Sequence, residues 1–318
     1  MTKKLGALIV CCAMVACGIA CTQREQVYVV GKDGVDAVFW LNGKKSVLPK
    51  AGIEAGAIAV AISGSDVYIA GWDDDDAVYW LNGQRHVLPK ASDEAVAMTI
   101  AVSGSDVHIA GWDGDARSDM SDAVFWLNGE RNVLPKTADN ARALAIAVSG
   151  SDMYVAGFSG FDAAFWLNGE IAVLATEGDS AWAGAIAISD SGVYVAGWDG
   201  NADQRGDAVY WLDGQRNVLP KTGNSTYANA VAASGSDVYF AGGDEAAEGR
   251  EAAYWNGGQN VLPKKTGDAI ADGVAISGSN VYIAGSDGNG AVYWRNGKRF
   301  ALPSANSFAK AYAIAIMP

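Results

Sequence analysis

"SGSDVYIAGWDDDDAVYWLNGQRHVLPK", residues 63–90, contains three short segments of alternating apolar residues that are separated by turn residues. The segments "VYIAG", "AVYWLNG" and "RHVLPK" are rich in Val, Ile, Tyr and Trp, which favour β-strands. Asn82-Gly83 is a typical two-residue hairpin signal, because both residue types accept a positive φ. The stretch therefore predicts antiparallel strands that are joined by tight turns.

This stretch is one copy of a repeat that runs through the chain. The Gly of "VYIAG" recurs at positions 31, 71, 111, 157, 197, 242 and 285, and the Trp of "AVYWLNG" recurs at positions 40, 80, 126, 166, 211, 255 and 294. Another alternating segment, typified by "AIAVAIS" at 57–63, precedes each "VYIAG" except the first. Four short strands in a unit of about 42 residues are typical of a β-propeller blade.

The two ends of the chain together supply one complete unit. The first unit begins at Val27 without an "AIAVAI" segment, whereas the chain finishes with "AYAIAI" at 311–316. We predict an all-β fold, a seven-bladed β-propeller of four-stranded antiparallel blades, whose ring is closed by pairing of the C-terminal strand with the N-terminal strands. The predicted blades are 27–49 with 311–317, 57–89, 97–135, 143–175, 184–220, 229–263 and 272–303.

Residue size predicts the order of the strands within a blade. The "AIAVAI" segments carry small residues such as Ala57 and Ala59 and are expected at the crowded central axis. Trp80 and its six equivalents are expected to fill the wedge between neighbouring blades. The "VLPK" segments are expected at the outer edge, where Pro and Lys would discourage pairing with further strands.

The first twenty residues are predicted to be a signal peptide of the lipoprotein type, followed by a propeller domain over 21–318. Lys3 and Lys4 precede an apolar run that ends in small residues. "GIAC" predicts lipidation at Cys21, and "MVAC" gives Cys17 as the alternative. Because all four cysteines lie in this segment or, as Cys21 does, at its edge, we expect no disulfide in the propeller. The expected location is the bacterial cell envelope, on the outer membrane or cell surface, with membrane contact only through the lipid.

Charge and composition exclude several functions. The net charge of −13 disfavours nucleic acid as a partner, because phosphate contacts need Lys and Arg. The two histidines, His86 and His108, form no zinc cluster or Ser–His–Asp set. We expect a monomer without enzymatic activity. A carboxylate-based glycan-active enzyme in the central funnel, a hydrolase or lyase, is the alternative.

Diversified loops between the repeats are the expected ligand-binding face. The turns "SGSD" and "NG" are nearly the same in every unit, whereas the loops on the opposite face vary and contain aromatic residues next to carboxylates. Such pairs suit a glycan, although capping of the hydrophobic wedge by the tryptophans explains the same pattern. Trp182 is expected in a loop. The ligand-face candidates are Trp72, Asp73, Asp75, Trp112, Asp113, Asp115, Trp182, Trp198, Asp199 and Asp203.

We expect no cofactor, and calcium is the one alternative that the sequence suggests. Asp199, Asn201 and Asp203 have the spacing of oxygen ligands in a calcium loop. Gln204 stands where Gly is expected, and no Glu follows at the twelfth position. Solvated turn residues explain the same pattern.

Over residues 27–316, the units "SGSDVYIAG…AVYWLNG…VLPK" resemble a class of bacterial envelope propeller repeats of the type "SGSDVYVAG…YWxNG". The resemblance implies an exported or lipid-anchored propeller and no particular activity. With the residue analysis, it predicts a non-enzymatic binding or scaffold module on the envelope, whose partner is a protein or a glycan.

Overall fold

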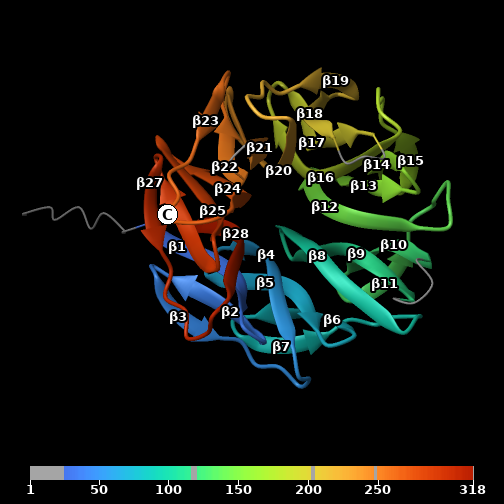
Figure 1. Cartoon of the computed structure of the whole chain (residues 1–318). Helices are drawn as coiled ribbons and strands as arrows, with labels where there is room; N and C mark the ends of the chain where they lie inside the picture. The colour runs from blue at the N-terminus through green and yellow to red at the C-terminus, as the bar shows by residue number, and fades with distance from the viewer. Residues whose placement is uncertain (1–24, 116–119, 202–204, 247–248, 318) are drawn as a thin grey trace, which may run out of the picture.

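The computed structural model describes residues 25–115, 120–201, 205–246 and 249–317. These residues form seven separate four-stranded antiparallel sheets, which are arranged around a central axis as a seven-bladed propeller (Figure 1). The predicted fold class is confirmed. The described residues contain no helix suited to spanning a bilayer. The predicted signal peptide, with Cys17 and Cys21, lies outside the described residues.

Each blade has the same order of strands from the axis outward. The first strands are β28 (Ala309–Met317), β4 (Ala55–Ser63), β8 (Glu94–Ser103), β12 (Ala141–Ser149), β16 (Ser180–Ser189), β20 (Ser225–Ser234) and β24 (Ala269–Ser277). The second strands are β1 (Gln26–Asp33), β5 (Asp66–Asp73), β9 (Asp106–Asp115), β13 (Asp152–Ser159), β17 (Gly192–Gly200), β21 (Asp237–Ala246) and β25 (Asn280–Asp287). The third strands are β2 (Asp36–Leu41), β6 (Asp76–Leu81), β10 (Met120–Leu127), β14 (Asp162–Leu167), β18 (Gly206–Leu212), β22 (Gly249–Trp255) and β26 (Gly290–Arg295). The fourth strands are β3 (Lys44–Val47), β7 (Gln84–Val87), β11 (Glu130–Val133), β15 (Glu170–Val173), β19 (Gln215–Val218), β23 (Gln259–Val261) and β27 (Lys298–Ala301).

The chain ends close the ring as predicted. Strand β28 pairs antiparallel with β1, with Ile314 opposite Val29, and lies beside it in Figure 1. Ile314 is buried in a cluster that also contains Trp40 of the first blade and Tyr282 of the last. Apolar burial at this seam therefore joins the last blade to the first. Blade 1 is β28-β1-β2-β3, and blades 2 to 7 are numbered in chain order, each with four consecutive strands from β4 onward.

A β-bulge in each first strand explains the Gly of "VYIAG". In blade 2, Ala57 is opposite Gly71 and Ala59 is opposite Ala70, so residue 58 has no partner. The carbonyl oxygen of Gly56 then approaches the second strand so closely that a Cβ on Gly71 would lie 1.9 Å from it. The same approach, at 1.9–2.0 Å, occurs at Gly31, Gly111, Gly157, Gly197, Gly242 and Gly285. A side chain is therefore excluded at this position in all seven blades.

The repeated Trp fills the space between blades and also bonds across it. Trp80 is fully buried, and its Nε1 donates to the carbonyl oxygen of Pro49 in the preceding blade at 2.8 Å. The same bond recurs in every blade: Trp40 to Pro303, Trp126 to Pro89, Trp166 to Pro135, Trp211 to Ala175, Trp255 to Pro220 and Trp294 to Pro263. Each indole thus satisfies its N–H while it buries its rings.

The structure corrects the role predicted for "LPK". Strand β3 ends at Val47, so Pro49 follows the outer strand instead of guarding its edge. Lys50 Nζ donates to the carbonyl oxygens of Val35 and Ile53 at 2.9 and 2.6 Å, and so ties two loops together. Pro and Lys therefore serve contacts between blades and loops.

The first strands are longer than predicted. Strand β16 begins at Ser180 instead of 184, and β20 begins at Ser225 instead of 229. The additional residues pair with the ends of the second strands, beyond the bulge. The repeats "AIAVAI" and "VYIAG" thus mark only the central part of each pairing.

Candidate functional site

The Trp-Asp pairs predicted for loops lie in strands. Trp72 and Asp73 end β5, while Trp112 and Asp113 belong to β9, which continues to Asp115. Trp198 and Asp199 belong to β17. Alternation along a strand sends the two side chains of each pair to opposite faces, so the pairs do not act as units.

The Asp of each pair is directed into the protein. Asp73 is 2% exposed, and its carboxylate accepts hydrogen bonds from the backbone N–H groups of Ala51 and Gly52 at 2.7 and 2.9 Å. The Nε atom of Arg85, from the outer strand of the same blade, lies 2.6 Å from Oδ2 of Asp73. This carboxylate therefore fixes the loop that leads into blade 2.

Equivalent side chains do the same in the other blades. The buried equivalents are Asp33, Asp113, Ser159, Asp199, Asp244 and Asp287. Burial alone would raise the pKa of Asp33, but hydrogen bonds from Lys45 and Ser304 outweigh it and hold the pKa well below its usual range. Asp73, Asp113 and Asp199 thus have internal partners, and they are not candidates for ligand contact.

One sequence signal could have revealed this network. Asp199 pairs with Arg216 at 2.5 Å, and Asp113 pairs with Arg131 at 2.6 Å. In blade 4, where Ser159 replaces Asp, Ile171 stands in the place of Arg, opposite Trp166. In blade 4 the acid and the cation disappear together, and in blade 6 Gln259 takes the place of the cation and donates to Asp244. Each buried Asp thus has a matching partner on the outer strand, which indicates a structural pair instead of a ligand site.

The tryptophans of blades 2 and 3 are covered by cations from neighbouring blades. Lys32 Nζ of blade 1 lies 4.9 Å from the centre of the Trp72 ring. The guanidinium carbon of Arg142, in blade 4, lies 4.1 Å from the centre of the Trp112 ring, and Trp112 is only 7% exposed. In these two blades, a cation from a neighbouring blade therefore occupies the ring face.

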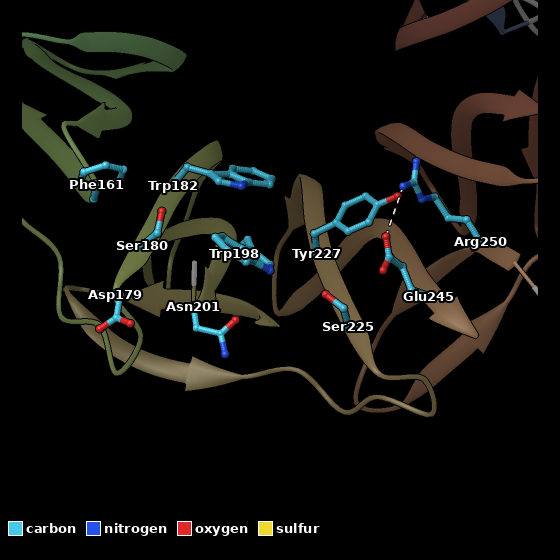
Figure 2. Close-up of a pocket in the computed structure, with 10 residues that line it drawn as sticks. All are labelled: Phe161, Asp179, Ser180, Trp182, Trp198, Asn201, Ser225, Tyr227, Glu245 and Arg250. Atoms are coloured by element: carbon cyan, nitrogen blue, oxygen red, sulfur yellow. Dashed lines mark hydrogen bonds and ion pairs between the residues drawn. The ribbon is translucent and has the colours of Figure 1, made fainter. Parts of the chain in front are cut away.

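Trp198 of blade 5 has different surroundings. It pairs across the strands with Trp182, which lies in β16, so the prediction that Trp182 lies in a loop was wrong. Both rings line a pocket of about 770 Å³ between blades 5 and 6. Figure 2 shows Phe161 of blade 4 at one end of this pocket, Trp182 and Trp198 in the middle, and Tyr227 and Arg250 at the other end.

Glycines that depart from the repeat make room for these rings. Trp182 lies against Gly184, where a Cβ would come 2.4 Å from the ring, and the other blades have larger residues at that position. Tyr227 lies against Gly243, where a Cβ would come 2.3 Å from the hydroxyl oxygen. In the other blades, a Trp or another larger residue follows the Gly of "VYIAG", which lies opposite the bulge; we call this Gly the bulge Gly. Gly243 replaces that larger residue in blade 6. Ring and glycine thus change together, as expected of a built pocket.

Polar groups surround the aromatic rings. Asp179, Ser180, Asn201, Ser225, Glu245 and Arg250 complete the pocket lining. Arg250 donates to Glu245 Oε1 at 3.2 Å and lies over the Tyr227 ring at 5.6 Å (Figure 2). Burial raises the pKa of the Tyr227 phenol, so this side chain stays neutral at physiological pH. Sequence reasoning missed Phe161, Tyr227 and Arg250, because they come from two blades, 4 and 6, and have no shared motif.

The remaining predicted residues do not form a site together. Asp75 is exposed in the turn between β5 and β6, and Asp115 is partly exposed at the end of β9. Of the predicted calcium set, Asp199 is buried against Arg216, Asn201 Oδ1 accepts from the N–H of Arg205, and Asp203 lies outside the described residues. Within the described ranges, no three His, Cys, Asp or Glu side chains cluster as metal ligands would.

A smaller cavity of about 250 Å³ lies among the first strands of the seven blades. Of the described residues that line it, Asp272 alone carries a carboxylate. Burial raises the pKa of Asp272 to about 6, although Lys310 Nζ lies 3.4 Å from its Oδ1. The cavity is otherwise lined mostly by aliphatic side chains and backbone, so its polarity is concentrated at one point.

Comparisons with known proteins identify the fold. No protein-family model matches the chain, and no curated protein matches it significantly. Among solved structures, the uncomplexed acylaminoacyl peptidase of Pyrococcus horikoshii is 12% identical, with a TM-score of 0.55 over 89% of this chain and 51% of that chain. An acylaminoacyl peptidase in complex with Z-Gly-Gly-Phe-chloromethyl ketone is 13% identical, with a TM-score of 0.53 over 89% of this chain and 51% of that one.

These matches support the propeller fold, and they do not indicate any activity for this chain. The chain spans about half the length of the peptidases that it resembles. Identities of 12 and 13% are too low to transfer a substrate or a site. Function must therefore be argued from the pocket itself.

Proposed function

We propose that this chain is a non-enzymatic binding module of the cell envelope and that its pocket between blades 5 and 6 holds a glycan. The observation that carries the proposal is the group of aromatic rings, Trp182, Trp198 and Tyr227, each of which lines the pocket. Aromatic rings stack on the apolar C–H face of a pyranose, and neighbouring carboxylates and amides accept hydroxyl protons. A concave site with a few polar groups is the usual form of a small-ligand site.

A glycan fits this lining better than a folded protein does. The pocket is concave and carries Asp179, Asn201 and Glu245 beside its rings, which matches alternating apolar and hydroxyl surfaces. The 75% exposed Phe161 at the rim offers a further ring to a longer oligosaccharide. We therefore choose the glycan from the two partner classes that the sequence left open. Envelope attachment through Cys21, or Cys17, remains part of the proposal.

The rival enzyme needs two carboxylates on either side of a glycosidic bond. Among the described residues that line the central cavity, Asp272 supplies only one. The pocket between blades 5 and 6 has Asp179 and Glu245, but Glu245 is already paired with Arg250 at 3.2 Å. Binding without turnover is therefore the function that the geometry supports best.

A glycan array with the purified propeller, followed by titration of tryptophan fluorescence, tests this function. We expect saturable binding that weakens by about tenfold, roughly 1.4 kcal/mol, in Trp198→Ala, because the ring that stacks on the sugar is removed. Trp72→Ala is the matched control, since Lys32 covers that ring. Absence of binding to any glycan, or equal binding by Trp198→Ala, would contradict the proposal. Release of smaller sugars would favour the enzyme.

A further inference from the structure

Aromatic rings around the pocket-side face of this propeller are repeatedly covered by cations. Lys32 covers Trp72 at 4.9 Å, and Arg142 covers Trp112 at 4.1 Å. Two tyrosines of the first strands follow the same rule, with Arg250 over Tyr227 at 5.6 Å and Lys310 over Tyr312 at 4.9 Å. A cation over a ring face is favourable by about 0.5–2 kcal/mol, depending on how far it is removed from water.

Trp198 departs from that rule. It occupies the position of Trp72 and Trp112 in its strand, directly after the bulge Gly. Within the described part of the chain, no Lys or Arg lies over its ring. Its ring lines the pocket instead. Lys32 comes from the preceding blade and Arg142 from the following one, and the equivalent positions beside blade 5 carry the uncharged Phe158 and Tyr227. The chain therefore leaves a cation over this ring for a ligand to supply.

The charge of the pocket also favours a cation. Its lining includes the carboxylates of Asp179 and Glu245 and one guanidinium, that of Arg250. The guanidinium already pairs with Glu245 at 3.2 Å, whereas Asp179 is exposed at the rim. The whole chain carries a net charge of −13, and such a field raises the local concentration of cationic ligands.

We propose that the glycan of this pocket carries a protonated amino group, which lies over Trp198 and is balanced by Asp179. This inference rests on the proposed function and narrows its ligand class to amino sugars with a free amine. The ligand would supply to Trp198 the cation that Lys32 and Arg142 supply to the equivalent rings. Stacking of the pyranose on Trp182 would remain available to neutral sugars.

Two matched oligosaccharides can separate glycan binding in general from a preference for a free amino group. The probes are short oligomers of glucosamine and the matching oligomers of N-acetylglucosamine, titrated against the whole propeller at mildly acidic pH, where the free amine is protonated. We expect the glucosamine form to bind about tenfold more tightly, which is roughly 1.4 kcal/mol. Trp198→Leu should abolish this preference. Asp179→Asn should weaken binding of the glucosamine form more than binding of the acetylated form, and so reduce the preference. Asp179 is exposed, so this substitution should not disturb folding.

The possible results distinguish failure of the amine preference from failure of glycan binding. Equal binding of the two oligomers would overturn the inference and leave the glycan-binding function standing. Failure of both oligomers and of every glycan on the array would overturn both. Preference for glucosamine that survives in Trp198→Leu and disappears with added salt would also overturn the inference, because it would reflect only the overall negative charge.

Discussion

Blades 2, 3 and 5 have the same residue at one position, but the environment of its side chain differs between blade 5 and the other two. In all three blades, a Trp-Asp pair follows the bulge Gly. Lys32 and Arg142 cover the rings of Trp72 and Trp112, whereas Trp198 lines a pocket. The Asp of each pair is buried in the same way in the three blades. The comparison shows that the Asp belongs to the scaffold in each blade, whereas the surroundings of the Trp differ from blade to blade.

Removal of a scaffold carboxylate should have the largest effect. Asp113→Ala leaves the N–H groups of Ala91 and Ser92 without their acceptor and leaves Arg131, with an 18% exposed side chain, without its partner. We expect a loss of about 3–5 kcal/mol in the free energy of unfolding, measured by chemical denaturation. Asp75→Ala, in an exposed turn, should change it by less than about 0.5 kcal/mol. Equal effects would mean that the Asp does not belong to the scaffold.

A pair of alanine substitutions within blade 5 should separate scaffold from pocket. In Gly197→Ala, the new Cβ would lie 1.9 Å from the backbone oxygen of Trp182, so we expect a loss of about 3 kcal/mol in stability. In Gly184→Ala, the three atoms nearest to the new Cβ all belong to the Trp182 ring, a side chain that can move. That variant should keep its stability within about 1 kcal/mol and lose glycan affinity. Thermal unfolding and glycan titration measure the two effects. The reverse assignment would contradict the division.

The bulge position that is Gly184 in blade 5 is Asp272 in blade 7, and there we expect a pH effect. The pKa of Asp272 is raised to about 6 by burial, so the folded protein holds this proton more tightly than the unfolded chain does. Protonated Asp272 contributes fully to the free energy of unfolding below the unfolded pKa of about 3.9. This contribution is lost as the pH rises toward 6 and the carboxyl ionises. Asp272→Asn should therefore gain about 2 kcal/mol in stability relative to the natural protein between about pH 4 and pH 7. A difference that does not vary with pH would show that Asp272 titrates normally.

Uncovering a capped ring should have the smallest effect. Arg142→Ala removes the guanidinium over Trp112 and should cost about 1 kcal/mol in stability. The tryptophan fluorescence should shift to the red, because water reaches a ring that is now 7% exposed. Glycan binding should not change, since Arg142 lies outside the pocket lining. An unshifted spectrum would mean that another group covers the ring.

The repeats made the architecture predictable because their period is local. Alternation, hairpin dipeptides and the unit length all lie within a few tens of residues, and the missing first strand of one unit pointed to "AYAIAI" at the other end of the chain. The positive φ of Asn82 and Gly83, 51° and 83°, confirms the predicted hairpin turn. The strand ends were less predictable, because the bulge interrupts the alternation before residues such as Trp182.

The candidate site was predictable only in part. Trp182 and Trp198 were found as aromatic residues on the variable face, and both line the pocket. Asp73 and Asp113 were chosen for their charge, but they are buried against backbone N–H groups. Composition cannot distinguish a carboxylate that binds a ligand from one that binds a loop.

The sequence by itself determined the number of blades, the order of strands and the closure of the ring, since each of these depends on a pattern within one unit or on the sum of units. Only the tertiary structure decided which of three equivalent tryptophans is open. The residue that covers each ring comes from a different blade, as Lys32 does for Trp72 and Arg142 for Trp112. Contacts between blades depend on side chains about one repeat apart, and no period in the sequence specifies which of them meet.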